Sequence, residues 1–239
     1  MDNGLLESLK RSPGLESVTK HPFFATVKDH PLTVRDVTTV LAQYWYPIEF
    51  FTTYLSSLIA KLPTGGPIRT VVSKILWQEL GEGSYEKAHL YLYVQTMTDA
   101  GFAEADIVGG AALEATRRLV DGYRESCGHH LDALGWLYGT EVIDLTICTG
   151  LGRAVKRVSG KTELPWVVIH AVQEPDHIVA ASATMESDGT KTRAAIEHAA
   201  VEAARIRAAA EDCWNRWRDF FTAINDRIAP RTIADTAHA

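Results

Sequence analysis

One stretch, His170-Ala-Val-Gln-Glu174-Pro-Asp-His177, constrains the fold more than any other part of the chain. In an α-helix the positions i, i+4 and i+7 share one face, so His170, Glu174 and His177 form a line of potential metal ligands. Apolar residues flank the stretch on both sides, which predicts a buried helix. Burying an unpaired carboxylate is costly, and a metal ion is its natural partner. The alternative is a buried helix with hydrogen-bonded histidines and a glutamate that reaches water.

Size and composition predict a globular protein with one core. The chain has 239 residues, of which 46% are hydrophobic and 23% are charged. Its formal net charge of −6 argues against binding to nucleic acid or to an anionic membrane. We therefore expect a single domain over residues 1–239, with a lead-in over 1–30 and a frayed tail over 230–239.

The cysteines and the apolar runs exclude further classes. The three cysteines are widely spaced and form no Cys-x-x-Cys pair, which disfavours a disulfide framework and a zinc–thiolate site. The first residues lack the apolar core of a signal peptide, and no apolar run is long enough to span a bilayer. We expect a cytoplasmic protein.

Apolar residues recur at helical spacing through most of the chain, and no alternating strand pattern of any length appears. Thr33 is a good N-cap, with Asp36 at the capping-box position, and Pro67 suits the first turn of a second helix. Further helices are expected through 86–96, from Gly109-Gly110 to Gly128, and over about 131–155, 164–184 and 191–228. This pattern predicts an all-α bundle of about seven helices.

Several carboxylates fall where an apolar face is expected. Glu141 lies within a stripe of leucines, and Glu49 lies among aromatic residues. Each alone could reach water from the rim of its helix. Together they fit a known pattern, in which two helices each supply a Glu and two others each supply Glu-x-x-His to a di-iron or di-manganese site. The residues that fit it are Glu49, Glu141, Glu86 with His89, and Glu174 with His177, and His170 adds a nitrogen. Carboxylate and imidazole ligands without thiolate suit iron or manganese.

In this order the residues resemble those of the haem-oxygenase-like di-iron oxidases, a family with a seven-helix bundle that binds no haem. The resemblance covers about residues 20–225. It implies a ligand set of Glu49, Glu79, His89, Glu141, His170, Glu174 and His177. Glu86 stays open as an alternative partner of His89, although Glu79 better matches the family's Glu-x-Gly pattern. The family more often has Asp at position 174, and Pro175 is expected to kink the helix and loosen one iron site.

The resemblance also implies a chemistry. Two Fe(II) ions would be the cofactors and dioxygen the co-substrate, with no catalytic residue beyond the metal ligands. The substrate would be a small carboxylic or amino acid, oxidised by desaturation, N-oxygenation, cyclisation or carbon–carbon fragmentation in natural-product biosynthesis. Arg153, Arg157 or Arg193 could bind the carboxylate of the substrate. The alternative is that each is an exposed arginine on the surface of a helix. The sequence leaves open whether the protein forms a homodimer.

Two rival interpretations remain at this point. One is a metal-free enzyme of the same architecture, either a cofactorless oxidase or a thiaminase-type hydrolase. The hydrolase needs a nucleophilic cysteine in its pocket, and Cys148 lies on the same stripe as Glu141. The other rival is an iron-binding protein without enzymatic activity.

Overall fold

The computed structural model describes residues 4–64, 66–184 and 193–229, and in these residues it contains helices but no strand. The prediction of an all-α fold is confirmed. The described helices are α1 Gly4–Lys10, α2 Pro13–Thr19, α3 Pro22–Asp29, α4 Val34–Lys61, α5 Pro67–Glu79, the 3-10 helix η1 Tyr85–Lys87, α6 His89–Asp99, α7 Glu104–Ile107, α8 Glu114–Ser126, α9 His130–Ser159, α10 Pro165–Ala183 and α11 Arg193–Ile228. None of them, within the described residues, is long and apolar enough to cross a membrane.

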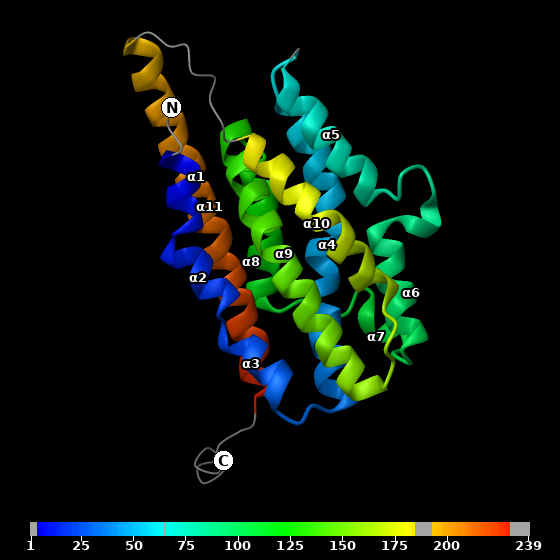
Figure 1. Ribbon diagram of the computed structural model, residues 1–239. Coiled ribbons are helices and arrows are strands. Elements are labelled where there is room, and N and C mark those ends of the chain that lie inside the picture. Colours follow the sequence, from blue (N-terminus) through cyan, green and yellow to red (C-terminus); the bar gives the residue numbers. More distant parts are fainter. Residues whose placement is uncertain (1–3, 65, 185–192, 230–239) are drawn as a thin grey trace.

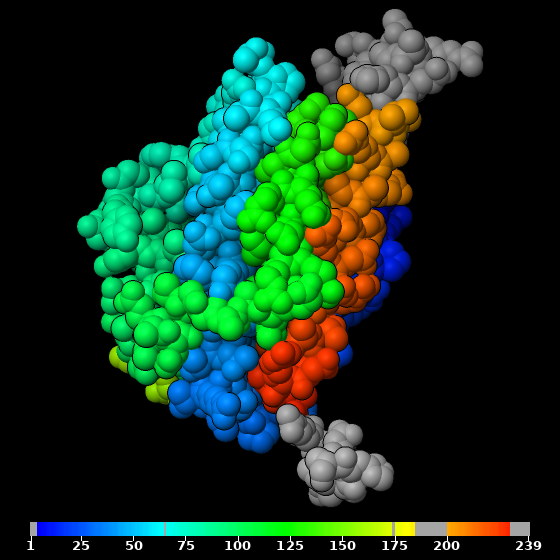
Figure 2. Space-filling view, turned by 180° about the vertical axis from the view of Figure 1, so that it is seen from behind, coloured from blue at the N-terminus to red at the C-terminus, as the bar shows by residue number. Residues whose placement is uncertain are grey.

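The centre of the bundle is α9, a 30-residue helix that packs against α11, α10, α4, α3 and α8 (Figure 1). Most of its residues from Ala133 to Ile143 are buried. On the opposite face of the molecule, α4, α8 and α11 lie side by side (Figure 2). Because α9 is buried over most of the stretch from Ala133 to Ile143, polar side chains there must find partners inside the protein.

The expected lead-in is three short helices. Pro13 and Pro22 occupy the first turns of α2 and α3, where a missing backbone N–H costs nothing. Ser12 and His21 cap these two helices through their side chains. The three helices lie along α11 (Figure 1), so they cover the bundle.

The expected start of the first long helix is confirmed. The hydroxyl of Thr33 accepts from the backbone of Asp36, whose carboxylate accepts from the backbone of Thr33, which is a complete capping box. The helix continues through Pro47 to Lys61. Pro67 opens α5 as predicted.

Two expected helix starts are wrong. Gly109 and Gly110 do not open a helix, because α8 begins at Glu114, after Leu113 as its N-cap. Glu86 does not share a helix with His89, since Glu86 belongs to η1 and α6 begins at His89. The described residues also form eleven α-helices rather than seven, mainly because the short helices near the N-terminus were counted as a lead-in.

Candidate metal centre

Five of the predicted ligands meet in the interior of the bundle. All five side chains are at most 7% exposed. They come from four helices: Glu79 from α5, His89 from α6, Glu141 from α9, and His170 and His177 from α10. Such a group of buried anionic and imidazole side chains is rare unless its members are paired or bind a metal ion.

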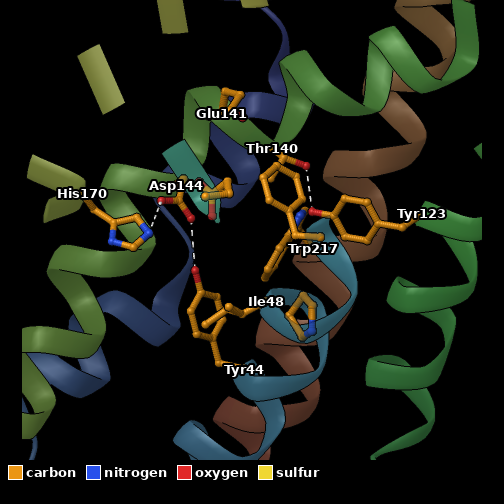
Figure 3. Close-up of a pocket in the computed structure, with 11 residues that line it drawn as sticks. Tyr44, Ile48, Tyr123, Thr140, Glu141, Asp144, His170 and Trp217 are labelled. Carbon is orange, nitrogen blue, oxygen red and sulfur yellow. Dashed lines mark hydrogen bonds and ion pairs between the residues drawn. The ribbon is translucent and has the colours of Figure 1, made fainter. Parts of the chain in front are cut away.

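Two rows of side chains face each other between α9 and α10. Oε2 of Glu141 lies 3.4 Å from Nδ1 of His177. Asp144, one turn further along α9, places Oδ2 3.8 Å from Nε2 of His170 (Figure 3). The helices run antiparallel, so successive residues of one row meet successive residues of the other.

A tight turn returns the chain from Glu79 to His89, and Oε2 of Glu79 lies 3.0 Å from Nδ1 of His89. Gly81 within that turn has a φ of +82°, a region that favours glycine. A Cβ at Gly81 would collide with the backbone of Ser84 and Ala88. The glycine therefore permits the turn that joins the end of α5 to the start of α6.

Neighbouring groups orient two of the imidazoles. Nε2 of His89 lies 2.9 Å from Oε1 of Gln173, which can accept a hydrogen from it. Nδ1 of His170 lies 2.7 Å from the carbonyl oxygen of Trp166. A carbonyl only accepts, so Nδ1 of His170 carries the hydrogen and Nε2 keeps its lone pair.

The electrostatics keep one carboxylate of the centre ionised. Burial alone would raise the pKa of Glu79, but the imidazoles of His89, His170 and His177 lower that pKa to about 2. Burial raises the pKa of Glu141, despite the nearby imidazole of His177. Burial lowers the pKa of His170, which favours its neutral form. Burial would lower the pKa of His89 as well, but the carboxylate of Glu79 raises that pKa, so the imidazoles of the centre differ in basicity.

One atom of the centre shows most directly that a cation suits it. Oε1 of Glu141 is buried and accepts no hydrogen bond from the described residues. An unsatisfied buried carboxylate oxygen costs free energy, and a metal ion would satisfy it. Two carboxylates and three imidazoles are a donor set that iron and manganese accept. The residues therefore fit the metal that the predicted family implies.

A cavity of about 40 Å³ adjoins the centre, with room for a few water molecules. Figure 3 shows how polar and aromatic side chains share its wall. The lining residues are Tyr44, Pro47, Ile48, Phe51, Glu79, Tyr123, Thr140, Glu141, Asp144, His170 and Trp217. Of the aromatic residues near Glu49, Tyr44 and Phe51 thus line the cavity, whereas Trp45, Tyr46 and Phe50 do not.

The structure does not bring two of the predicted ligands to the centre. The side chain of Glu49 is exposed on α4 and does not line the cavity, although Pro47 and Ile48 of the same turn do. Glu86 is exposed too, and its carboxylate accepts a hydrogen bond from Ser84. Glu79, and not Glu86, is the carboxylate that lies beside His89. Glu174 belongs to α10, but its side chain lies outside the described residues.

The predicted substrate anchors do not reach the cavity in the described part of the structure. Arg153 is exposed, and Arg157 donates to the backbone carbonyls of Val27 and His30. The side chain of Arg193 lies outside the described residues. Cys148 is buried but does not line the cavity, so it is badly placed for a nucleophile.

Sequence reasoning missed Asp144 and Gln173. Asp144 stands three residues after Glu141 and four before Cys148, so it shares the face of α9 that carries both. That spacing could have identified it. Gln173 has no such signal, because an isolated glutamine beside an exposed valine looks like any surface residue of a helix.

Comparisons with known proteins agree with this geometry. A family model described as iron-containing redox enzyme matches residues 38–212. No curated protein matches the chain at a significant level. Among solved structures, a CADD-like protein of unknown function from Nostoc punctiforme superposes with a TM-score of 0.74 at 13% identity, covering 95% of this chain and 96% of that one.

Two other solved structures share the fold. A TenA homologue from Pseudomonas syringae gives a TM-score of 0.70 at 14% identity, with 93% of each chain covered. A domain of unknown function with a haem-oxygenase-like fold, from Shewanella denitrificans, gives 0.67 at 15% identity, again with 93% of each chain covered. At such identities these likenesses describe the fold alone. The family model, however, spans most of the 239 residues, so the chain belongs to the family of iron-containing redox enzymes with the haem-oxygenase-like fold.

Proposed function

We propose that this protein is a non-haem di-iron enzyme that uses dioxygen to oxidise a small carboxylic or amino acid. The observation that carries the proposal is the meeting of Glu79, His89, Glu141, His170 and His177 in the interior, beside a cavity. Membership of an iron-containing redox family supports the metal. The class of substrate, and a role in natural-product biosynthesis, rest on the resemblance of the ligand pattern.

The chain's own residues would bind and orient the metal. Glu79 and Glu141 would supply negative charge, and the three imidazoles would supply nitrogen ligands. The amide of Gln173 and the carbonyl of Trp166 hold His89 and His170 in fixed orientations, which reduces the cost of assembling the ligands. Two Fe(II) ions held there would supply the electrons for dioxygen chemistry, which amino-acid side chains do not supply.

The cavity wall would position the substrate. Tyr44, Ile48 and Phe51 from α4 present an apolar surface opposite the ligands on α9, and such a surface limits the entry of water. Tyr123 and Thr140 hydrogen-bond to each other at 2.7 Å on the same wall. The small volume favours dioxygen and a short substrate over a bulky one.

The test is dioxygen consumption. Protein is loaded with Fe(II) under anaerobic conditions, mixed with air-saturated buffer, and followed by oxygen electrode and absorbance against a library of small carboxylic and amino acids. We expect consumption that depends on both iron and one class of acid, and its loss in His170→Ala. No consumption with any acid would contradict the proposal. Hydrolysis without metal would favour the thiaminase-type alternative, and iron uptake without turnover would favour a binding protein.

A further inference from the structure

One of the five ligands also belongs to a group of three side chains that the proposed di-iron centre does not explain. They are Asp144 and Cys148 on α9 and His170 on α10. One ligand atom from each lies within 4.8 Å of the others. Of the three, only His170 belongs to the predicted ligand set, and Cys148 brings a sulfur atom to a centre that otherwise offers oxygen and nitrogen.

Two of the distances in this group are close to those of ligands around one ion. Sγ of Cys148 lies 3.2 Å from Oδ2 of Asp144, and Nε2 of His170 lies 3.8 Å from the same oxygen. Ligands bound about 2.0–2.3 Å from a zinc-sized ion in a tetrahedron lie roughly 3.3–3.8 Å apart. Asp144 and Cys148 also stand at i and i+4 of one helix, a spacing that brings two side chains to the same face.

The orientation of the side chains also suits a cation between them. Nδ1 of His170 contacts the carbonyl oxygen of Trp166, which turns Nε2 of the ring toward the carboxylate of Asp144. Oδ2 of Asp144 accepts the thiol hydrogen of Cys148, and a cation in place of that hydrogen would contact oxygen, sulfur and nitrogen together. The hydroxyl of Tyr44 donates to Oδ1 of Asp144 at 3.0 Å, which holds that carboxylate in its orientation (Figure 3).

We propose that Asp144, Cys148 and His170 form a thiolate-containing subsite of the metal centre, suited to a divalent ion such as Zn²⁺ or Fe²⁺. On binding, the S–H bond of Cys148 breaks, its proton leaves to water, and a metal–sulfur bond forms. The carboxylate and the thiolate then neutralise the two charges of the ion. Three protein ligands leave one position open beside the cavity. The inference extends the proposed function, because it assigns a ligand set to one of two adjacent metal positions.

The test uses Co²⁺ as the probe, without dioxygen or substrate. Cobalt bound by a thiolate gives a near-ultraviolet charge-transfer band that carboxylate and imidazole ligands do not give. We expect this band in the metal-free protein titrated with Co²⁺, and its complete loss in Cys148→Ser. The matched control is Cys213→Ser, which changes another buried cysteine, one that contacts Trp136 and Thr140, and should keep the band.

Absence of the band in the unmodified protein, or its persistence in Cys148→Ser, would overturn the proposal. Circular dichroism checks that each variant is folded. If Cys148→Ser is not, Asp144→Asn replaces it and must require at least about 10-fold more Co²⁺ for the same band. The outcome is separable from that of the proposed function. Iron-dependent oxygen consumption without a thiolate band refutes only the subsite, and a thiolate band without oxygen consumption refutes only the oxidase.

Discussion

The carboxylate of Glu141 faces the imidazole of His177 at 3.4 Å, across the interface between α9 and α10. On the same interface Asp144 faces His170 at 3.8 Å. The two helices thus bring acid and imidazole together in pairs. Side chains that the packing of two helices holds in place lower the cost of assembling a metal centre.

The choice between Glu79 and Glu86 can be tested with a matched pair of substitutions. Glu79→Gln keeps the size of a buried side chain 3.0 Å from His89 but removes its charge, so metal affinity should fall by at least about 100-fold. Glu86→Gln changes an exposed residue and should leave the affinity unchanged. Isothermal titration with Mn²⁺ measures both. Equal loss in the two variants would contradict the assignment.

Glu49 provides a second control on the same assay. Its side chain is exposed on α4, so Glu49→Gln should bind Mn²⁺ as the unmodified protein does. A large loss of affinity in Glu49→Gln would return this residue to the ligand set and would require α4 to turn in the metal-bound protein.

Gly81 should matter more than other glycines with positive φ. Any residue with a Cβ pays about 1–2 kcal/mol for such a backbone. Gly81→Ala adds a collision with the backbone of Ser84 and Ala88, whereas Gly101→Ala meets nothing within 4 Å. We expect Gly81→Ala to lower the free energy of unfolding more than Gly101→Ala does, and also to weaken metal binding. Urea unfolding and metal titration of both variants check this, and equal effects would contradict it.

Much of the fold could be predicted from local signals. The capping box of Thr33 and Asp36, and Pro67 in a first turn, depend only on neighbours in sequence, and the structure has both. The prolines of the first 30 residues were harder, because a proline can end one helix or begin the next. Packing against α11 and α9 favours the short helices that follow Pro13 and Pro22.

The site was predictable where a ligand lies on a regular helical face. Glu141 stands out because an apolar stripe surrounds it, and it is buried as that stripe implies. Glu49 has a similar local pattern but is exposed, since the rotation of α4 within the bundle depends on its partners and not on its own sequence. Glu86 does not lie beside His89 for another reason. The spacing Glu-x-x-His brings two side chains together only within one helix, and the chain changes from η1 to α6 between these residues.

Pro175 should weaken one metal position. It lies inside α10, where it cannot donate a hydrogen bond to the preceding turn, next to Glu174 in the predicted motif. Pro175→Ala restores that donor, so the helix should become stiffer and the more weakly held ion should bind more tightly without substrate. Fe(II) titration of both proteins under anaerobic conditions measures the two occupancies. Equal, tight occupancy of both positions in the unmodified protein would leave Pro175 without this role.

His21 should make stability depend on pH away from the metal centre. Burial lowers the pKa of His21 below its ordinary value of 6.5, an effect that Arg218 reinforces and Asp226 opposes. Nδ1 of His21 accepts from the backbone of Phe23, so protonation there would break the cap of α3. The neutral ring's stabilisation is therefore complete above pH 6.5 and is lost as the pH falls through the lower pKa of the folded protein.

The measurement is the free energy of unfolding between pH 7.5 and 5.5, compared with His21→Asn, which can cap the helix but does not titrate. The unmodified protein should lose stability more steeply on acidification, by at most about 1.4 kcal/mol per pH unit. Parallel curves for the two proteins would show that His21 is not the group responsible.

Iron binding by the buried side chains of α5, α6, α9 and α10 underlies the proposed function. The most direct measurement is the iron content per chain after anaerobic loading with Fe(II) and removal of unbound metal, in the unmodified protein and in Glu141→Ala. We predict up to two irons per chain in the unmodified protein, with the second more weakly held. Glu141→Ala should retain clearly less iron. No iron retained by the unmodified protein, or equal retention by both proteins, would contradict it.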